Sequence, residues 1–245
     1  MVFVAVGIWF HFWLVLLTLY AGGAIILIGL FNRHSPLIQK VCSWWGRALL
    51  KVSRIPVQVE GLEHLAPGQA YVYAANHRSN FDIFVLIGNL PGRFLWVAKK
   101  SLFQIPIFGQ TLTSMGSISV DRENLQSAVL SLNRAAAIVK SGVSMIIFPE
   151  GTRAASRELL PFKKGVFIMA LKGGQPIVPV SLSGTRFIQP RETLRVRPGP
   201  VKMIISPPIM PTSFRRKEEL MAAVRQAIED HFDPDFPYGP GSPTS

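Results

Sequence analysis

The chain has 245 residues, one cysteine and a formal net charge of +12 at pH 7. This length suits one domain of ordinary size with an attachment segment, and the single cysteine, Cys42, excludes an internal disulfide and an all-cysteine metal site. The positive charge predicts an anionic partner, which can be nucleic acid, anionic lipid or a phosphorylated substrate.

The chain begins with a long uncharged and apolar segment. Residues 1–31 contain no Asp, Glu, Lys or Arg. As an α-helix they would be about 46 Å long, against a bilayer core of about 30 Å. We predict that the segment enters a membrane and is retained, because no positive region precedes it as in a signal peptide. Gly22 and Gly23 interrupt the apolar run, so a tilted span and a hairpin within one leaflet both remain open.

A cationic, amphipathic segment comes next. Its basic side chains are Arg33, His34, Lys40, Arg47, Lys51 and Arg54. Such a flank tends to stay on the cytoplasmic side, so we expect the catalytic domain to face the cytoplasm, at the inner membrane if the source is bacterial. Residues 36–52 have apolar side chains at helical spacing, and their adjacent tryptophans favour an interfacial helix over an ordinary core-facing helix. With a membrane segment beside it, lipid is the favoured anionic partner.

The rest of the chain alternates short apolar runs with helical patterns. We predict strands at residues 71–75, 94–98, 118–120, 145–148, 177–182 and 203–205. We predict helices at residues 81–89, 125–140, 165–171 and 214–232. This alternation indicates an α/β fold, with a mostly parallel sheet flanked by helices and an N-terminal membrane-embedded helical segment. The predicted divisions are a membrane anchor at 1–54, a catalytic domain at 55–232 and a flexible tail at 233–245.

The segment NHRSNFD follows the first predicted strand of the catalytic domain. Its His77 and Asp82 therefore lie at a strand end, where α/β proteins place reactive groups. An Asp near the start of the next helix can accept a hydrogen bond from one imidazole nitrogen and leave the other free to take a proton. The alternative is that Asp82 only favours the helix N-terminus and that His77 is a hydrogen-bonded turn residue.

Cationic residues follow three other predicted strands. The segment FPEGTR makes a sharp turn and ends in Arg153, whose planar guanidinium matches phosphate oxygens. Glu150 in this segment could accept hydrogen bonds that hold the turn or the arginine. Arg122 in GSISVDR follows another strand, and Lys99 and Lys100 follow a third. Because these charges lie at neighbouring strand ends, they predict a shared phosphate pocket.

The motifs NHRSNFD, AKK, GSISVDR, FPEGTR with PFKKG, and IVPVSLSG occur in this order between residues 75 and 184. As a set they resemble the successive motifs of the glycerophospholipid acyltransferase family. The resemblance implies an acyl-CoA or acyl carrier protein donor as co-substrate and no further cofactor. It implies transfer of the acyl group to the sn-2 hydroxyl of 1-acylglycerol-3-phosphate, which gives phosphatidic acid at a lipid bilayer.

The resemblance also implies roles for individual residues. His77 would be the general base, with Asp82 as its orienting partner. Arg122 and Arg153 would bind the acceptor phosphate, with Lys100 as a third ligand. The residues expected to shape the pocket are Asn76, Ser79, Glu150, Gly151, Thr152 and Pro179.

Several other chemistries are disfavoured by the sequence. No Ser or Cys lies in a nucleophile signature such as GxSxG, so we expect direct transfer without an acyl-enzyme. The histidines form neither HExxH nor a spaced Cys/His set, so no metal is expected. Nucleic acid is not expected as a partner, because no basic-aromatic motif is present. An acyltransferase for glycerol-3-phosphate, another lysophospholipid or a glycolipid, and a catalytically silent lipid-binding protein, remain as alternatives.

Overall fold

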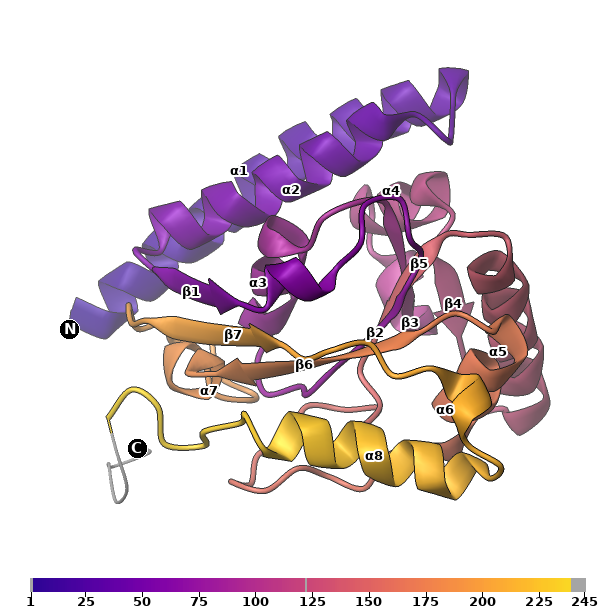
Figure 1. Ribbon diagram of the computed structural model, residues 1–245. Coiled ribbons are helices and arrows are strands. Elements are labelled where there is room, and N and C mark those ends of the chain that lie inside the picture. The colour runs from indigo at the N-terminus through magenta and orange to yellow at the C-terminus, as the bar shows by residue number, and fades with distance from the viewer. Residues whose placement is uncertain (1, 122, 239–245) are drawn as a thin grey trace.

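The computed structural model describes residues 2–121 and 123–238, and its centre is a twisted β-sheet (Figure 1). The strand order is β1-β7-β6-β2-β5-β3-β4. The strands are β1 Val57–Glu60, β2 Val72–Ala75, β3 Phe94–Lys99, β4 Ile118–Val120, β5 Ser144–Ile147, β6 Ile177–Ser183 and β7 Val201–Ile205. Neighbouring strands are parallel except β6 and β7, which are antiparallel. The predicted α/β fold with a mostly parallel sheet is confirmed.

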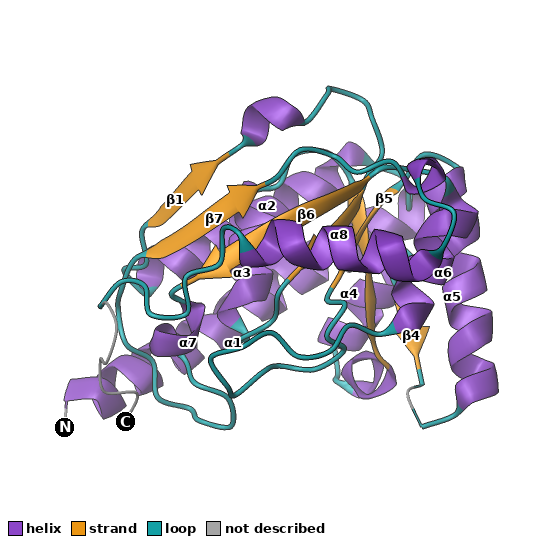
Figure 2. Cartoon of the chain, turned by 60° about the horizontal axis from the view of Figure 1, so that its bottom comes forward, coloured by secondary structure: helices purple, strands orange, loops and turns teal. Residues whose placement is uncertain are grey.

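Helices cover both faces of this sheet. They are α1 Val2–Phe31, α2 Pro36–Val52, α3 Phe81–Asn89, α4 Phe108–Met115, α5 Leu125–Lys140, α6 Lys164–Gly173, α7 Thr185–Ile188 and α8 Lys217–Glu229. Short 3-10 helices are η1 Leu62–His64, η2 Lys100–Gln104 and η3 Pro211–Ser213. α1, α2 and α3 pack together on one face, and α8 crosses the opposite face, in front of the sheet in Figure 2.

Burial explains why the central strands were recognisable from the sequence. β2, β5 and β6 are buried at every position, as expected of strands covered by helices on both sides. The edge strand β1 instead alternates between half-buried and exposed residues, because one of its faces meets solvent.

The apolar N-terminal segment is one continuous helix, and the glycine pair does not interrupt it. Gly22 allows α4 to approach α1, because a Cβ there would lie 2.8 Å from Ile107 Cγ2 and 2.8 Å from Thr111 Oγ1. Val6–Phe31 is long and apolar enough to cross a membrane by length and composition. The inner side of α1 nevertheless contributes buried residues to the protein core, namely Phe10, Ala21 and Ile25.

The predicted flexible tail begins with a segment that contacts the core. The Asp233 N–H donates to Ser183 Oγ at 2.9 Å, and the Asp235 carboxylate pairs with the Arg157 guanidinium. The rest of the predicted tail, residues 239–245, lies outside the described residues.

Candidate active site

Three strands bring the polar turns predicted from the sequence together by their register. β2 lies between β5 and β6, with Ala74 opposite both Ile147 and Pro179. The strands are parallel, so their carboxyl ends meet at one edge of the sheet. The turn after β2, which contains His77, therefore lies beside the FPEGTR turn after β5. Pro179 is within β6, next to the turn that holds His77.

His77 and Asp82 form the predicted pair. Their Nδ1 and Oδ2 atoms are 2.8 Å apart, and the histidine side chain is 14% exposed while the aspartate is fully buried. Asp82 Oδ2 also accepts hydrogen bonds from the backbone N–H groups of Arg78, at 2.6 Å, and Ser79, at 2.8 Å. The carboxylate thus holds the turn before α3 and orients the imidazole at the same time.

This geometry determines which imidazole nitrogen can act as a base. An ionised carboxylate can only accept, so His77 Nδ1 carries the hydrogen and Nε2 is left as the acceptor. The ring is stacked on Phe148, with centroids 3.8 Å apart and planes at 10°. Two neighbours therefore fix the imidazole ring: Asp82 through a hydrogen bond and Phe148 through ring stacking.

Glu150 fastens the histidine turn to the FPEGTR loop. Its Oε1 accepts from the His77 N–H at 2.8 Å, and its Oε2 accepts from the Leu160 N–H at 2.8 Å. Burial raises the pKa of Glu150, while these two hydrogen bonds and the positive charges of Arg78 and His77 oppose the rise. A further bond runs from the Ala154 N–H to the His77 carbonyl at 2.9 Å.

Two other predicted pocket residues support the turn from behind. The Asn76 amide donates to the Leu182 carbonyl at 2.9 Å and accepts from the Leu182 N–H at 2.7 Å. Ser79 Oγ donates to the Gln189 carbonyl at 2.8 Å. Both side chains connect the turn to β6 and the chain that follows it.

Arg78 has a structural role that the sequence did not reveal. It is only 1% exposed, and its guanidinium donates to the carbonyls of Ser156 and Arg157 and lies 4.6 Å from the centroid of the Phe232 ring. Burial lowers its pKa, and the carboxylates of Glu150 and Asp82 oppose that change. An arginine in a polar turn gives no sequence signal of such burial.

The predicted phosphate ligands have different surroundings. Arg153 lines a cleft that we call the α1 cleft. Its walls are Phe10, His11, Leu14, Asn80, Phe84, Arg153, Gln189, Glu192, Thr193 and Leu194. Lys100 is at the start of η2, 60% exposed, with its Nζ 3.1 Å from Asp121 Oδ2. Arg122 lies outside the described residues.

The backbone conformation of the FPEGTR turn explains why it contains a glycine. Gly151 has a φ of 74°, a left-handed conformation that favours glycine, and its N–H donates to the Phe148 carbonyl at 3.0 Å. Thr152 is exposed next to it. Gly151 and Thr152 therefore form the tip of the turn, which sets the direction of Arg153.

An apolar cavity lies between the N-terminal helices and the catalytic core. α1, α2, α3, β3 and α4 all contribute side chains to it, including Ile25, Trp45, Ile87, Trp96 and Met115. The Trp96 ring is also 6.0 Å from the Phe148 ring, which stacks on His77. The cavity wall is thus separated from the imidazole by one aromatic ring.

Within the described residues, no cluster of three or more His, Cys, Asp or Glu side chains could hold a metal ion. The chemistry visible at this site is that of a positioned imidazole base, a buried carboxylate and a nearby arginine.

The family model for acyltransferases matches residues 56–183, a range that includes the His77 turn and the FPEGTR turn. The chain therefore belongs to the acyltransferase family.

Individual members of this family support a narrower relationship. The chain is 39% identical over 165 residues to a 1-acyl-sn-glycerol-3-phosphate acyltransferase of Cocos nucifera, covering 67% of this chain and 53% of that protein. It is 35% identical over 208 residues to one of Limnanthes alba, covering 81% and 71%. The crystal structure of the LPA acyltransferase PlsC from Thermotoga maritima superposes with a TM-score of 0.82 at 27% identity, over 93% of both chains. The chain spans about half the length of the Cocos nucifera protein.

Proposed function

We propose that this protein transfers a fatty acyl group from a thioester donor to the sn-2 hydroxyl of 1-acylglycerol-3-phosphate, giving phosphatidic acid. The observation that carries the proposal is the 2.8 Å contact between His77 Nδ1 and Asp82 Oδ2, which leaves Nε2 as a base. The apolar cavity beside the stacked ring is suited to an acyl chain. The Cocos nucifera and Limnanthes alba relatives are both named 1-acyl-sn-glycerol-3-phosphate acyltransferases, which is the same acceptor.

The proposed reaction is a direct transfer. His77 Nε2 takes the proton from the acceptor hydroxyl while the oxygen attacks the thioester carbonyl carbon. The negative charge of Asp82, 2.8 Å from Nδ1, stabilises the imidazolium that forms. The carbon–sulfur bond then breaks, and the thiolate takes the proton from the imidazolium. The donor leaves as a free thiol and His77 returns to its neutral form.

The α1 cleft is the proposed site of the acceptor phosphate. Arg153 supplies a guanidinium that can bind phosphate oxygens in a bidentate manner, and Phe10 and Leu14 supply apolar walls from α1. A lipid acceptor needs both kinds of surface. Because α1 forms one wall, the acceptor would approach from the membrane side of the molecule.

The packing of α1 supports placement of the helix within one leaflet. Near its start, a Cβ on Gly7 would lie 3.0 Å from the Leu194 carbonyl oxygen, and near its end a Cβ on Gly29 would lie 3.2 Å from Ser114 Cβ. These two positions are about 33 Å apart along a helix. A helix that contacts the catalytic core over such a length cannot cross a bilayer of about 30 Å unless the core enters the bilayer as well.

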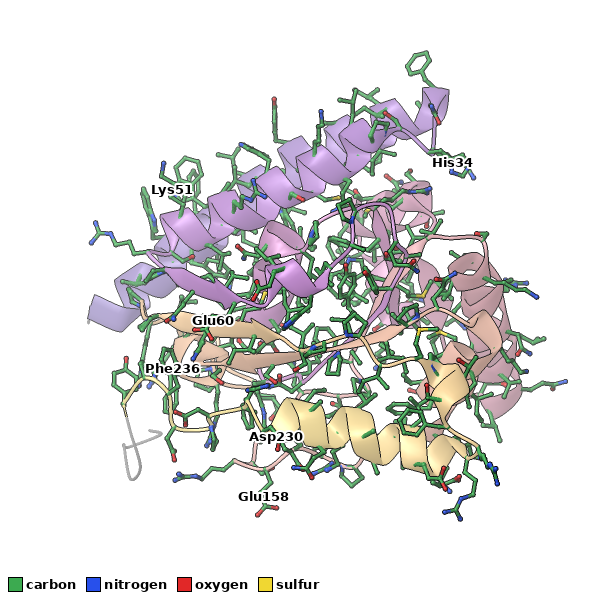
Figure 3. The ribbon with its side chains drawn as sticks, in the orientation of Figure 1. His34, Lys51, Glu60, Glu158, Asp230 and Phe236 are labelled. Atoms are coloured by element: carbon green, nitrogen blue, oxygen red, sulfur yellow. The ribbon has the colours of Figure 1, made fainter. Side chains whose placement is uncertain are left out.

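The charges on α2 agree with a membrane-surface orientation. Figure 3 shows the labelled His34 and Lys51 on the side of the molecule where α1 and α2 lie, and Glu158 on the opposite side. We propose that this cationic side faces anionic headgroups of the cytoplasmic leaflet, with the exposed apolar side chains of α1 in the hydrocarbon. The most exposed of these are Ile8, Phe12, Tyr20, Leu27, Leu30 and Phe31.

The proposed activity can be tested with the purified chain in lipid vesicles. With 1-acylglycerol-3-phosphate and either acyl-CoA or acyl carrier protein, we expect equal amounts of free thiol and phosphatidic acid. His77→Ala should lower kcat by about 10²- to 10⁴-fold, the range typical of a general base. Near-normal turnover by that variant would refute the role of His77.

Two further outcomes decide between the alternatives. A panel of glycerol-3-phosphate, other lysophospholipids and glycolipid precursors identifies a different acceptor if one is preferred. If neither donor releases thiol with any acceptor, the protein is a lipid-binding protein without catalytic activity. Without acceptor, a burst of thiol equal to the enzyme concentration would contradict direct transfer and indicate an acyl-enzyme.

A further inference from the structure

A second cationic pocket lies next to the active site, and the proposed chemistry does not use it. It is lined by Ala154 and Ala155 of the chain after FPEGTR and by Arg186, Phe187, Pro190, Arg191 and Arg197. Every charged residue in this lining is an arginine, so we call it the arginine pocket. Its free volume of about 120 Å³ exceeds by far the roughly 10–15 Å³ that one water molecule needs.

Arg186 lies between this pocket and a smaller pocket that is lined by Arg78, Ser156 and Phe232. The Nη1 of Arg186 is buried and has no hydrogen-bond partner within the described part of the chain. Burial is the main cause of the lowered pKa of Arg78, and the positive charge of Arg186 adds to it, so a second cation is close to Arg186. A buried guanidinium nitrogen without an acceptor is unfavourable, and an anion bound by the accessible part of the Arg186 side chain would offset part of the repulsion between the two cations.

The other two arginines are fixed at the pocket by the backbone around them. Arg191 Nη1 donates to the Arg153 carbonyl at 3.1 Å, and its Nε is 2.9 Å from Oε1 of Glu192, which is 74% exposed. An ion pair with so exposed a carboxylate is weak and leaves the Arg191 guanidinium able to bind a further anion. The Arg197 N–H donates to the Ile188 carbonyl at 2.9 Å, which holds its chain against α7.

The pocket shares a wall with the catalytic turn. Ala154 lines it, and the Ala154 N–H donates to the His77 carbonyl at 2.9 Å. The preceding residue, Arg153, instead lines the α1 cleft. A ligand in the arginine pocket would therefore lie close to the reacting groups without occupying the proposed acceptor site.

The lining also indicates the kind of anion. The α1 cleft and the apolar cavity include side chains of the N-terminal helices, whereas the lining of the arginine pocket includes none. It therefore combines three guanidinium groups with the apolar side chains of Ala154, Ala155, Phe187 and Pro190, and has no wall from the helices proposed to lie in the membrane. Because it is concave, it suits a small phosphate ester better than the convex acidic surface of a carrier protein.

We propose that Arg186, Arg191 and Arg197 bind a phosphate ester of the thioester donor, specifically the 3′-phosphate of an acyl-CoA. This inference rests on the proposed function, because it assigns the water-soluble end of the proposed donor to this pocket. The acceptor phosphate remains with Arg153. The two substrates then use separate cationic sites. The acceptor phosphate binds Arg153 in the α1 cleft, and the donor phosphate binds the arginine pocket, whose wall includes the next residue, Ala154.

The test compares Arg186→Gln with wild type, using acyl-CoA and acyl-dephospho-CoA, which lacks the 3′-phosphate. We expect Arg186→Gln to raise the KM for acyl-CoA by about tenfold or more, the loss of one charge-assisted hydrogen bond, with the acceptor KM unchanged. In wild type, acyl-dephospho-CoA should show a similar rise, and in the variant the two donors should differ little. Arg134→Gln, which removes an exposed arginine on α5, is the matched control and should behave like wild type.

Binding of 3′,5′-ADP by calorimetry gives a readout that does not need turnover. It should weaken in Arg186→Gln and with added salt, but not in Arg134→Gln. An unchanged acyl-CoA KM in Arg186→Gln, or an equal loss in both variants, would overturn the inference. The inference would also be overturned if the protein used only acyl carrier protein as the donor and did not bind 3′,5′-ADP. Failure of wild type to acylate any acceptor sinks the proposed function, whereas nucleotide binding still reports on the pocket.

Discussion

The Asp82 carboxylate uses its two oxygens very unequally. Oδ2 accepts from His77 Nδ1 and from the N–H groups of Arg78 and Ser79, whereas Oδ1 is buried without a partner among the described residues. A side-chain amide can therefore keep all three contacts with its single oxygen while it removes the negative charge. A substitution of Asp82 by asparagine can therefore separate its two roles, which are to hold the turn and to stabilise the imidazolium.

Asp82→Asn should keep the fold and lose most of the activity. The amide oxygen can still orient His77, but the imidazolium formed during proton transfer no longer has a carboxylate beside it. We expect kcat to fall by about 10²- to 10⁴-fold. Stability should fall by about 1–3 kcal/mol, because the new N–H₂ replaces the unpartnered Oδ1. Initial rates at saturating substrates and thermal unfolding measure the two effects.

The matched control is Asp82→Ala. This variant leaves the N–H groups of Arg78 and Ser79 without their acceptor, so it should unfold at a lower temperature than Asp82→Asn and be at least as inactive. If Asp82→Asn instead turns over near the wild-type rate, the carboxylate only holds the turn, and the general-base mechanism needs another source of charge stabilisation.

The buried carboxyl group of Glu150 should make the folding stability fall as pH rises. Burial raises its pKa above the ordinary value of 4.5, so the folded state binds more protons than the unfolded state between these two pKa values. Folding stability from this group is then fully present below about pH 4.5 and decreases as pH rises through the folded-state pKa. Glu150→Gln cannot ionise and should lack this decrease.

Urea unfolding of wild type and Glu150→Gln over a pH series measures the difference. As pH rises above the ordinary Glu value, wild type should lose stability relative to the variant. A difference that is constant with pH, or that changes in the opposite direction, would show that the two backbone hydrogen bonds at 2.8 Å outweigh burial.

The sequence predicted the dyad and several residues that hold its turn, but not the burial of Arg78 or the arginine pocket, for a physical reason. His77 and Asp82 lie five positions apart in one turn, so local geometry is enough to bring them together. Arg78 is in the same turn, yet its partners Ser156 and Phe232 come from distant parts of the chain. The arginine pocket likewise needs the chain around Ala154 to meet residues 186–197. Contacts across such sequence separations leave no periodic pattern.

Secondary elements were predicted best where an apolar run or a helical period marks them in the sequence. The strands β2, β5 and β6 and the helices α3 and α5 were recognisable from apolar runs and helical spacing. β1 was missed because it is a short edge strand with Gln58 and Glu60 facing outward. α4 was missed because it has only eight residues, of which two are threonines and one is glycine. Its role becomes visible only through its packing on α1.

Gly22 and Gly23 provide a matched pair for testing the α1–α4 contact. A Cβ at Gly22 would approach Ile107 and Thr111 to 2.8 Å, whereas a Cβ at Gly23 has nothing within 4 Å. Both neighbours are β-branched and cannot easily rotate away. Gly22→Ala should therefore destabilise the protein by about 1–3 kcal/mol. Gly23→Ala should be neutral or stabilising by up to about 1 kcal/mol, because alanine is the better helix former.

Thermal unfolding of both variants in the same detergent measures this contrast. Because the apolar cavity also has Gly22 and Thr111 in its wall, Gly22→Ala should in addition change the relative rates with donors of different acyl-chain length. Equal stability of the two variants would mean that α1 does not pack on α4 in the detergent-bound protein.

The exposed apolar side chains of the molecule are concentrated on one side. α1 carries most of them, with Phe31 92% exposed, α2 adds Trp44, which is 45% exposed, beside its basic side chains, and the sheet separates both helices from α8 (Figure 1). An exposed apolar surface of this kind is unstable in water and marks a membrane or protein interface. The proposed in-leaflet arrangement explains both this exposure and the long contact between α1 and the catalytic core.

Single cysteines at the two ends of α1 can distinguish the in-leaflet arrangement from a spanning helix. Ile8→Cys and Phe31→Cys replace exposed residues, and the native Cys42 is buried and needs no removal. A fluorophore attached at either position should be quenched to a similar degree by lipids brominated at a shallow depth, and from the same leaflet. Leu130→Cys, exposed on α5, is the control and should be quenched only by water-soluble quenchers. If the two α1 positions instead respond to opposite leaflets, α1 crosses the bilayer and must separate from α4 when the protein inserts.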